Sequence, residues 1–375
     1  MFGKKKKEEK PKFYTLTNIL AKNADYNIIF GERSNGKTYA CLEYMIREYV
    51  ASGKQGAYIR RWREDLRGKR AENLFNALVV NGVISHLTKG EYNNVFYYNG
   101  KWFLSTYDEE SRKHVPDLTP FCYAFSLAEQ EHEKSTSYPH VGTIVFDEFL
   151  TRRYYLPDEF MLLMNLLSTI IRQRDDVKVF MLGNTINRYS PYFAEMGLRN
   201  VQVQEQGTID IYRFGAGGAV VAVEYCATIQ QDKPSNKYFC FDNENLQMIT
   251  GGKWELAVYP HLPSKYRPKD VLLKFYIIFG DAVLQGNIIQ TDTETFCYIH
   301  AKTTPIRDTD NYLIYSLDMC GKPNYSRKII TTATPMLAAV AKYFATDKVF
   351  YQNNEIGEIV RNYLLASAKT NIIPK

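Results

Sequence analysis

The chain has 375 residues, of which 45% are hydrophobic and 23% charged, a composition that is typical of globular proteins and excludes a fibrous or wholly disordered chain. No apolar run reaches the length of about 18 residues that a membrane span requires, and the lysine-rich start has no apolar segment behind it. We therefore expect an intracellular protein without a membrane partner. Residues 1–12 carry +4 of the net charge of +6, so a nucleic-acid surface must be argued from local clusters.

The first part of the chain alternates predicted strands with predicted helices. An apolar strand at residues 26–30 precedes a periodic helix at about residues 37–52, and a short strand at 57–59 leads into a basic stretch. A β-hairpin that turns at Asn99–Gly100 interrupts the pattern. Further buried strands are predicted at residues 121–126, 142–146, 177–182 and 219–225. This alternation predicts a parallel α/β sheet in a domain that spans residues 13–228.

The rest of the chain differs in character. Residues 229–263 are polar and contain glycine and proline, which indicates a linker or a small lid. Residues 264–375 predict an α+β domain that begins with β-strands and ends with an amphipathic helix at 355–368. The strands are expected at residues 272–279, 282–289 and 295–300. Residues 1–12 are expected to form a basic, flexible tail, either solvated or in contact with nucleic acid.

The six cysteines and six histidines indicate neither a disulfide framework nor a metal centre. The cysteines form no CxxC pair, and no histidine pair has metal-ligand spacing beside cysteine or carboxylate residues. We expect buried thiols in a reducing compartment and no structural zinc site.

The sequence GERSNGKT after the first strand fits the phosphate-loop pattern G-x-x-x-x-G-K-[ST] at every fixed position. The glycines let backbone N–H groups turn toward phosphates, Lys37 reaches the β- and γ-phosphates, and the Thr38 hydroxyl binds Mg²⁺. The following helix adds the partial positive charge of its amino terminus. The pattern therefore predicts an ATP and Mg²⁺ site that comprises Gly31, Glu32, Arg33, Ser34, Asn35, Gly36, Lys37 and Thr38.

Polar side chains end two later strands. Asp147 and Glu148 follow an apolar strand, so Asp147 is expected to complete the Mg²⁺ site and Glu148 to act as the general base on the attacking water. Hydrolytic motors carry such a carboxylate, whereas signalling GTPases usually lack it. Asn184 ends the apolar run at residues 179–184 in a polar amide and suits a γ-phosphate sensor of an additional-strand ATPase. An acidic turn at Asp147 and a turn cap at Asn184 are the alternatives.

Arginines at the far end of a predicted helix are candidates for action in trans. The helix from Pro157 to about Arg172 spans roughly 24 Å and runs away from the phosphate edge. Arg172 and Arg174 are therefore better placed for a neighbouring subunit's site, which would require a ring. Salt bridges with Asp175 or Asp176 are the alternative. Secondary candidates for neutralising phosphate charge are Arg33 and Lys134.

A basic cluster after the second strand has two interpretations. Its arginines contact phosphate, on DNA or at a subunit interface, or they form a solvated face paired with Glu64 and Asp65. The cluster comprises Arg60, Arg61, Arg63 and Arg67.

These motifs, with the YIRR and IVFDEF stretches and the run RQRDDVKVFMLGN, resemble the genome-packaging ATPases of small short-tailed, prohead-RNA-dependent phages. The resemblance covers about residues 25–195. It implies a homopentameric motor in the host cytoplasm that docks at the portal vertex of a procapsid, binds prohead RNA and drives double-stranded DNA inward by ATP hydrolysis. It also implies that Lys37 and Thr38 bind phosphate and Mg²⁺, that Asp147 completes the metal site, that Glu148 is catalytic and that Arg172 is the finger.

The same resemblance implies a C-terminal RNase H-like domain that has lost nuclease activity. A two-metal nuclease needs several converging carboxylates, and the predicted strand at 272–279 carries none. We expect this domain to grip DNA backbone or prohead RNA, with ordinary surface lysines as the alternative; the candidates are Lys265, Arg267, Lys269 and Lys274.

Three other functions remain open from the residues. A terminase-like enzyme would both pump and cut DNA, and it would need a working carboxylate cluster. A filamentous-phage-type assembly ATPase would normally add a membrane span. A nucleotide-switched interaction protein would need slow hydrolysis, which Glu148 argues against.

Overall fold

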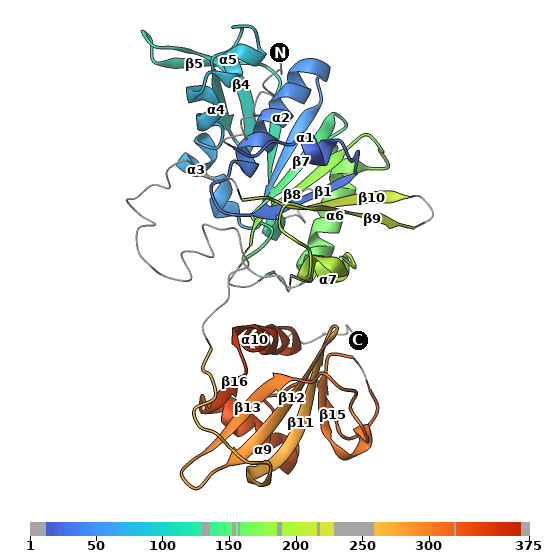
Figure 1. Cartoon of the computed structure of the whole chain (residues 1–375). Helices are drawn as coiled ribbons and strands as arrows, with labels where there is room; N and C mark the ends of the chain where they lie inside the picture. Colours follow the sequence, from blue (N-terminus) through green and yellow to red (C-terminus); the bar gives the residue numbers. More distant parts are fainter. Residues whose placement is uncertain are drawn as a thin grey trace, which may run out of the picture. The chain divides into compact units, whose positions relative to one another are not determined.

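A computed structural model describes residues 13–129, 136–151, 155–156, 158–185, 190–215, 218–228, 259–318 and 320–368. The chain divides into two units, Met1–Glu255 and Leu256–Lys375 (Figure 1). The basic tail, Lys134, Pro157 and most of the expected linker lie outside the described residues. None of the described helices combines the length and the apolar character needed to cross a bilayer.

The first unit is built on one ten-stranded sheet with the order β3-β4-β6-β2-β7-β8-β1-β10-β9, and β5 pairs with β4. Its six central strands, from β6 to β10, are parallel. The strands are β1 Tyr26–Gly31, β2 Gln55–Arg60, β3 Asn94–Tyr98, β4 Lys101–Asp108, β5 Lys113–Pro116, β6 Cys122–Ser126, β7 Val141–Asp147, β8 Lys178–Asn184, β9 Ile209–Phe214 and β10 Ala219–Tyr225. The predicted parallel α/β sheet is confirmed.

Helices cover both faces of this sheet. On one face, Met45 and Ile46 of α2 (Lys37–Ser52) pack in a core with Ile29. On the other face, Leu163 and Leu166 of α6 (Glu159–Ile171) pack in a second core. Because both faces are buried, the central strands are continuous apolar runs, and this pattern made them recognisable in the sequence. The shorter helices are α1 Thr17–Leu20, α3 Gly68–Glu72, α4 Asn76–Val80, α5 Val83–Leu87 and α7 Pro191–Glu195.

The predicted hairpin is confirmed as β3 and β4, with positive φ at both Asn99 (45°) and Gly100 (76°), as a type I′ turn requires. The helix expected to reach Arg172 ends at Ile171, and Arg172 is left-handed with φ of 43°. The edge strands β5 and β9 were not predicted. They pair antiparallel to β4 and β10, respectively, and their residues do not alternate cleanly between apolar and polar.

The second unit is an α+β unit with a six-stranded mixed sheet of order β15-β14-β11-β12-β13-β16. Strands β11, β12 and β13 lie at the three positions predicted from the sequence and form an antiparallel meander, and parallel strands extend both of its edges. The elements are β11 Val271–Phe279, β12 Ala282–Gln290, β13 Thr295–Ala301, β14 Leu313–Ser316, β15 Tyr325–Ser326, α9 Pro335–Ala345, β16 Val349–Tyr351 and α10 Asn354–Ala368.

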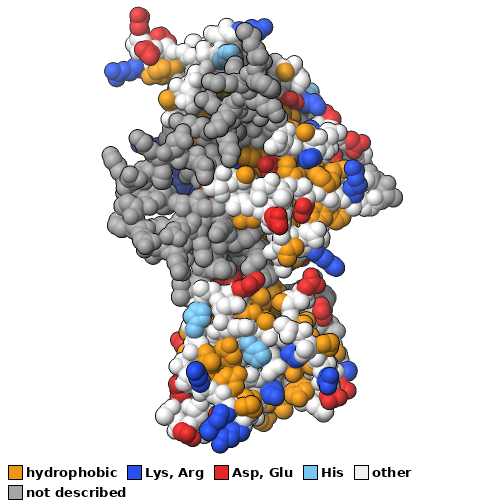
Figure 2. All heavy atoms as spheres, in the orientation of Figure 1, with side chains coloured by type: hydrophobic (Ala, Val, Ile, Leu, Met, Phe, Trp, Pro, Cys, Tyr) orange, Lys and Arg blue, Asp and Glu red, His pale blue; other side chains and the backbone are white. Residues whose placement is uncertain are grey.

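Charged side chains of both signs are interspersed on the coloured part of the face that Figure 2 shows. Figure 2 shows Lys and Arg mixed with Asp and Glu on the visible face of each unit, without one continuous basic field. This distribution agrees with the small net charge outside the first twelve residues.

Candidate functional site

The phosphate loop connects the carboxyl end of β1 to the start of α2. Gly36 has a φ of 95°, which favours glycine, and it allows the loop to turn directly into the helix. Glu32 and Asn35 are buried, whereas Arg33 and Ser34 are exposed. Lys37 lies inside the loop and is only 6% exposed.

The Lys37 ammonium is held by three acceptors. It donates to the Glu32 carbonyl at 2.6 Å, to Asn35 Oδ1 at 3.1 Å and to Asn184 Oδ1 at 3.4 Å. Burial lowers the pKa of Lys37, and the nearby Asp147 and Glu32 carboxylates oppose this shift. Phosphate oxygens at this position would stabilise the charged amine that burial disfavours.

Thr38 and Asp147 meet across the loop, although 109 residues separate them. The Thr38 hydroxyl donates to Asp147 Oδ2 at 3.0 Å, and the Tyr58 hydroxyl donates to the same oxygen at 2.8 Å. A hydroxyl and a carboxylate are oxygen ligands of the kind that Mg²⁺ prefers, and Mg²⁺ commonly completes its shell with phosphate and water. The residues present therefore fit the cofactor predicted for this position.

Strand β8 lies between the strand of the phosphate loop and the strand of the acidic pair. Its register places Asn184 beside Gly31 of β1, while Leu182 lies beside Asp147 of β7. This arrangement brings the Asn184 side chain to Lys37. The extra strand between β1 and β7 is the feature of the additional-strand fold that the sequence predicted.

Glu148 leaves the end of β7 in a left-handed conformation, with φ of 56°. Its carboxylate forms an ion pair with Arg60, whose Nη2 lies 2.6 Å from Glu148 Oε2 and 3.3 Å from Asp65 Oδ2. Burial lowers the pKa of Arg60, but the nearby Tyr58 hydroxyl and Glu148 carboxylate outweigh it, and the net pKa is raised. The expected general base is therefore engaged by an arginine of the basic cluster.

Arg61 has a different environment from its neighbours in the basic cluster. It is 6% exposed and forms a bidentate pair with Glu159 of α6, with both N–O distances 2.8 Å. It also donates to the carbonyls of Glu148 and Phe149, at 3.1 Å and 2.8 Å. The expectation of a phosphate-contacting or solvated side chain is wrong for Arg61, because the fold buries it against α6.

The other arginines of the cluster stay at the surface. Arg63 pairs with Glu129 at 2.7 Å, and both side chains are partly exposed. Arg67 is exposed.

Arg172 and Arg174 lie at the end of α6 opposite the acidic pair. Arg174 donates to the carbonyl of Val141 at 2.6 Å, and Val141 begins the strand that Asp147 ends. Seven residues of strand separate the two ends by roughly 20 Å, so these arginines do not reach their own Lys37 site. Arg174 also bonds the Tyr138 and Ile170 carbonyls, whereas Arg172 is exposed and bonds the carbonyls of Thr136 and Thr169.

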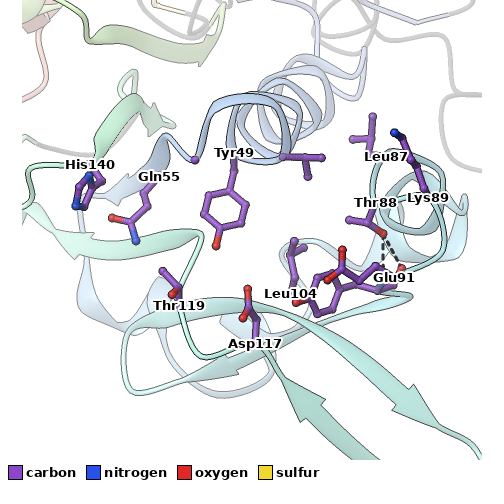
Figure 3. A pocket seen from close by; sticks show the side chains of 13 residues that line it. Tyr49, Gln55, Leu87, Thr88, Lys89, Glu91, Leu104, Asp117, Thr119 and His140 are labelled. Atoms are coloured by element: carbon purple, nitrogen blue, oxygen red, sulfur yellow. Dashed lines mark hydrogen bonds between the residues drawn. The ribbon is translucent and has the colours of Figure 1, made fainter.

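A cavity of about 690 Å³ lies elsewhere in the first unit (Figure 3). Gln55 at the start of β2 and His140 just before β7 line one side of it, while Tyr49 and Asp117 point into it. These positions are at the amino ends of the parallel strands, so the cavity is separate from the phosphate loop.

The loop, the strand order and the carboxylate at the end of β7 define the first unit as a phosphate-loop α/β protein of the additional-strand class. Residues 8–206 match the profile of the Podovirus DNA encapsidation protein (Gp16) family. The chain belongs to that family.

The comparisons with individual proteins agree. The DNA packaging protein of Bacillus phage phi29 is 31% identical over 194 residues, which are 51% of this chain and 52% of the relative. The corresponding protein of Bacillus phage B103 is 31% identical over 183 residues, 48% of this chain and 50% of the relative. The chain thus matches about half the length of these relatives.

A solved structure shares the fold over nearly the whole chain. The bacteriophage Phi-29 viral genome packaging motor assembly superposes with a TM-score of 0.58 and 20% identity, over 95% of this chain and 100% of that chain.

Sequence reasoning missed two residues that hold the site in place. Tyr58 on β2 bonds Asp147, and Glu159 on α6 anchors Arg61. Tyr58 carried no signal because tyrosine is common in buried strands, and Glu159 carried none beyond that of an acidic residue near the start of a helix.

Proposed function

We propose that the chain is an ATP-hydrolysing motor subunit that moves double-stranded viral DNA into a preformed procapsid through the portal vertex. The observation that carries the proposal is the convergence of Lys37, Thr38 and Asp147 at one edge of the sheet. Membership of the DNA encapsidation family, whose phi29 relative is a DNA packaging protein, supports DNA as the substrate. The subunit would act in the host cytoplasm as a homo-oligomeric ring, a pentamer, with prohead RNA and the portal as partners.

The proposed chemistry follows from the positions of five side chains. Lys37 binds the β- and γ-phosphates, Thr38 and Asp147 hold Mg²⁺, and Asn184 orients the γ-phosphate through its place beside Lys37. Mg²⁺ supplies charge neutralisation on the phosphate oxygens. Glu148 takes the proton of the attacking water, and it must first leave Arg60, because the ion pair at 2.6 Å occupies a carboxylate oxygen.

A neighbouring subunit is proposed to supply the arginine finger. Arg172 suits this role better than Arg174, because Arg172 is exposed while Arg174 is bound to several backbone carbonyls. Arg33, exposed on the loop, is a further candidate, and Lys134 lies outside the described residues. Mixing Glu148→Gln and Arg172→Ala subunits is expected to restore hydrolysis at some interfaces; no restoration would exclude Arg172.

The second unit is proposed to bind nucleic acid without cutting it. The proposal that it does not cut rests on strand β11, which carries no carboxylate where a two-metal site would need one. Lys265, Lys269 and Lys274 are exposed, while Arg267 pairs with Asp270 at 3.3 Å. The three lysines are therefore better candidates for backbone contact than Arg267.

Steady-state ATP hydrolysis with and without double-stranded DNA tests the proposal. We expect stimulation by DNA of any sequence, weakened by salt and lost in Glu148→Gln and Lys37→Ala. Hydrolysis that ignores DNA would refute translocation while leaving the nucleotide site intact. Cleavage of the DNA in Mg²⁺ or Mn²⁺ would refute the absence of nuclease activity.

A further inference from the structure

The phosphate loop is held from outside by a segment that precedes β1. The backbone N–H of Tyr14 donates to the Asn35 carbonyl in the loop at 2.9 Å. A Cβ atom added to Gly36 would lie 3.5 Å from Phe13 Cβ and 3.7 Å from the Tyr14 nitrogen. The segment thus lies in van der Waals contact with the last turn of the loop.

Tyr14 also joins this segment to β10, which is distant in the sequence but lies beside β1 in the sheet. Its hydroxyl donates to Glu224 Oε2 at 2.6 Å, across 210 residues of sequence, and both side chains are at least nine-tenths buried. Glu224 lies on β10 beside Ile29 of β1, two residues before the loop begins. Burial raises the pKa of Glu224, and the hydrogen bond from Tyr14 opposes that shift. The bond is therefore a strong constraint on the position of Tyr14.

The residue after the carboxyl end of β10 holds the start of the loop. Cys226 donates its backbone N–H to the Phe30 carbonyl at 2.9 Å, and a Cβ atom on Gly31 would come within 2.8 Å of Cys226 Cβ. The loop is thus fixed at Gly31 by Cys226 and at Asn35 by Tyr14. Glu224 connects the two fixed points.

Asn35 carries this constraint to the reactive part of the loop. Its Oδ1 accepts from the Lys37 ammonium at 3.1 Å and from the Lys37 backbone N–H at 3.3 Å. A shift of the Asn35 backbone would therefore move an acceptor that now orients Lys37.

We propose that Tyr14 is a positioning residue for nucleotide binding, which acts through its hydrogen bonds to Glu224 and Asn35 to hold the phosphate loop in a conformation that is ready to bind phosphate. The inference rests on the proposed nucleotide site. Because Tyr14 contacts the loop backbone and Glu224 and not Glu148, it is expected to act on the affinity for nucleotide more than on the chemical step.

Tyr14→Phe in the full chain tests this role, because it removes the hydroxyl and keeps the ring. We expect the Kd for a fluorescent ADP analogue and the KM for ATP to rise about tenfold, the equivalent of one hydrogen bond to a charged group, with kcat nearly unchanged. Glu224→Ala should raise Kd and KM in the same way. Glu224→Gln should leave both close to the wild-type values, because the amide oxygen still accepts from the Tyr14 hydroxyl. Hydrogen exchange of residues 31–38 should become faster in Tyr14→Phe.

Tyr259→Phe is the matched control. Tyr259 donates to Glu358 Oε2 at 2.7 Å in the second unit, so the substitution removes the same kind of bond away from the loop. It should lower thermal stability without a change in nucleotide Kd. The inference would be overturned if Tyr14→Phe had the same nucleotide Kd and the same loop exchange rate as the wild-type protein. Equal falls in kcat and kcat/KM in Tyr14→Phe would also overturn it. If the wild-type protein bound no nucleotide, the proposed function would fail, while the exchange of residues 31–38 would still decide whether Tyr14 fixes the loop.

Discussion

Replacement of Arg61 by methionine is expected to destabilise the first unit severely. The substitution leaves Glu159, which is 2% exposed, as a buried carboxylate without its cationic partner. Tyr192 and the backbone N–H of Leu156 still donate to it, each at 2.6 Å, but they supply no formal charge. Breaking a buried ion pair on one side typically costs about 3–5 kcal/mol.

This cost can be measured as a shift in thermal unfolding. For a unit of this size, a loss of about 3–5 kcal/mol lowers the Tm of its transition by roughly 6–20 °C. Differential scanning calorimetry of the full chain would follow that transition. Hydrolysis should also fall at temperatures where the variant is folded, because Arg61 holds the carbonyl of Glu148.

Arg63→Met is the matched control, two residues along the chain. Arg63 pairs with Glu129 at the surface, with side-chain exposures of 48% and 37%, and such pairs contribute only about 0–1 kcal/mol. The double variant Arg61→Met/Glu159→Met should recover much of the lost stability, since it removes both buried charges. A Tm shift in Arg61→Met no larger than that in Arg63→Met would refute the reasoning.

Three further predictions concern the acidic end of β7. Thr38→Ala should raise the Mg²⁺ concentration needed for half-maximal hydrolysis, and an unchanged Mg²⁺ titration would exclude Thr38 as a ligand. Tyr58→Phe removes a donor to Asp147 and should weaken apparent Mg²⁺ affinity by about 10-fold or more, measured in the same titration against wild type. Arg60→Ala releases Glu148, so hydrolysis without DNA should rise and stimulation by DNA should shrink; a parallel fall of both rates would contradict this.

The sequence predicted the phosphate loop and the ends of the central strands, because these features are local. Lys37 and Thr38 follow a fixed pattern, and Asp147 follows a continuous apolar run. The sequence could not distinguish the environment of Arg60 from that of Arg61. Neighbouring residues at the end of a strand point to opposite faces, so Arg60 shares the side of Tyr58 and the acidic pair, while Arg61 faces α6.

Contacts between residues that are distant in the chain could not be predicted from the sequence either. The contact of Tyr14 with Glu224 spans 210 residues, and that of Arg61 with Glu159 spans 98, and neither pair has a sequence signature. Both depend on which strands become neighbours in the sheet, which is a property of the tertiary fold. The edge strand β9 was missed for a related reason, because its residues range from partly buried to exposed and show no clear period.

The packing of Cys226 against Gly31 has a mechanical consequence. Cys226 directly follows β10 and packs against Gly31, at the start of the phosphate loop. A Cβ on Gly31 would lie 2.8 Å from Cys226 Cβ, so the two segments are too closely packed to slide past each other independently. A displacement of the loop at Gly31 is therefore expected to move the backbone at Cys226 with it, because the Cys226 N–H is also bonded to the Phe30 carbonyl.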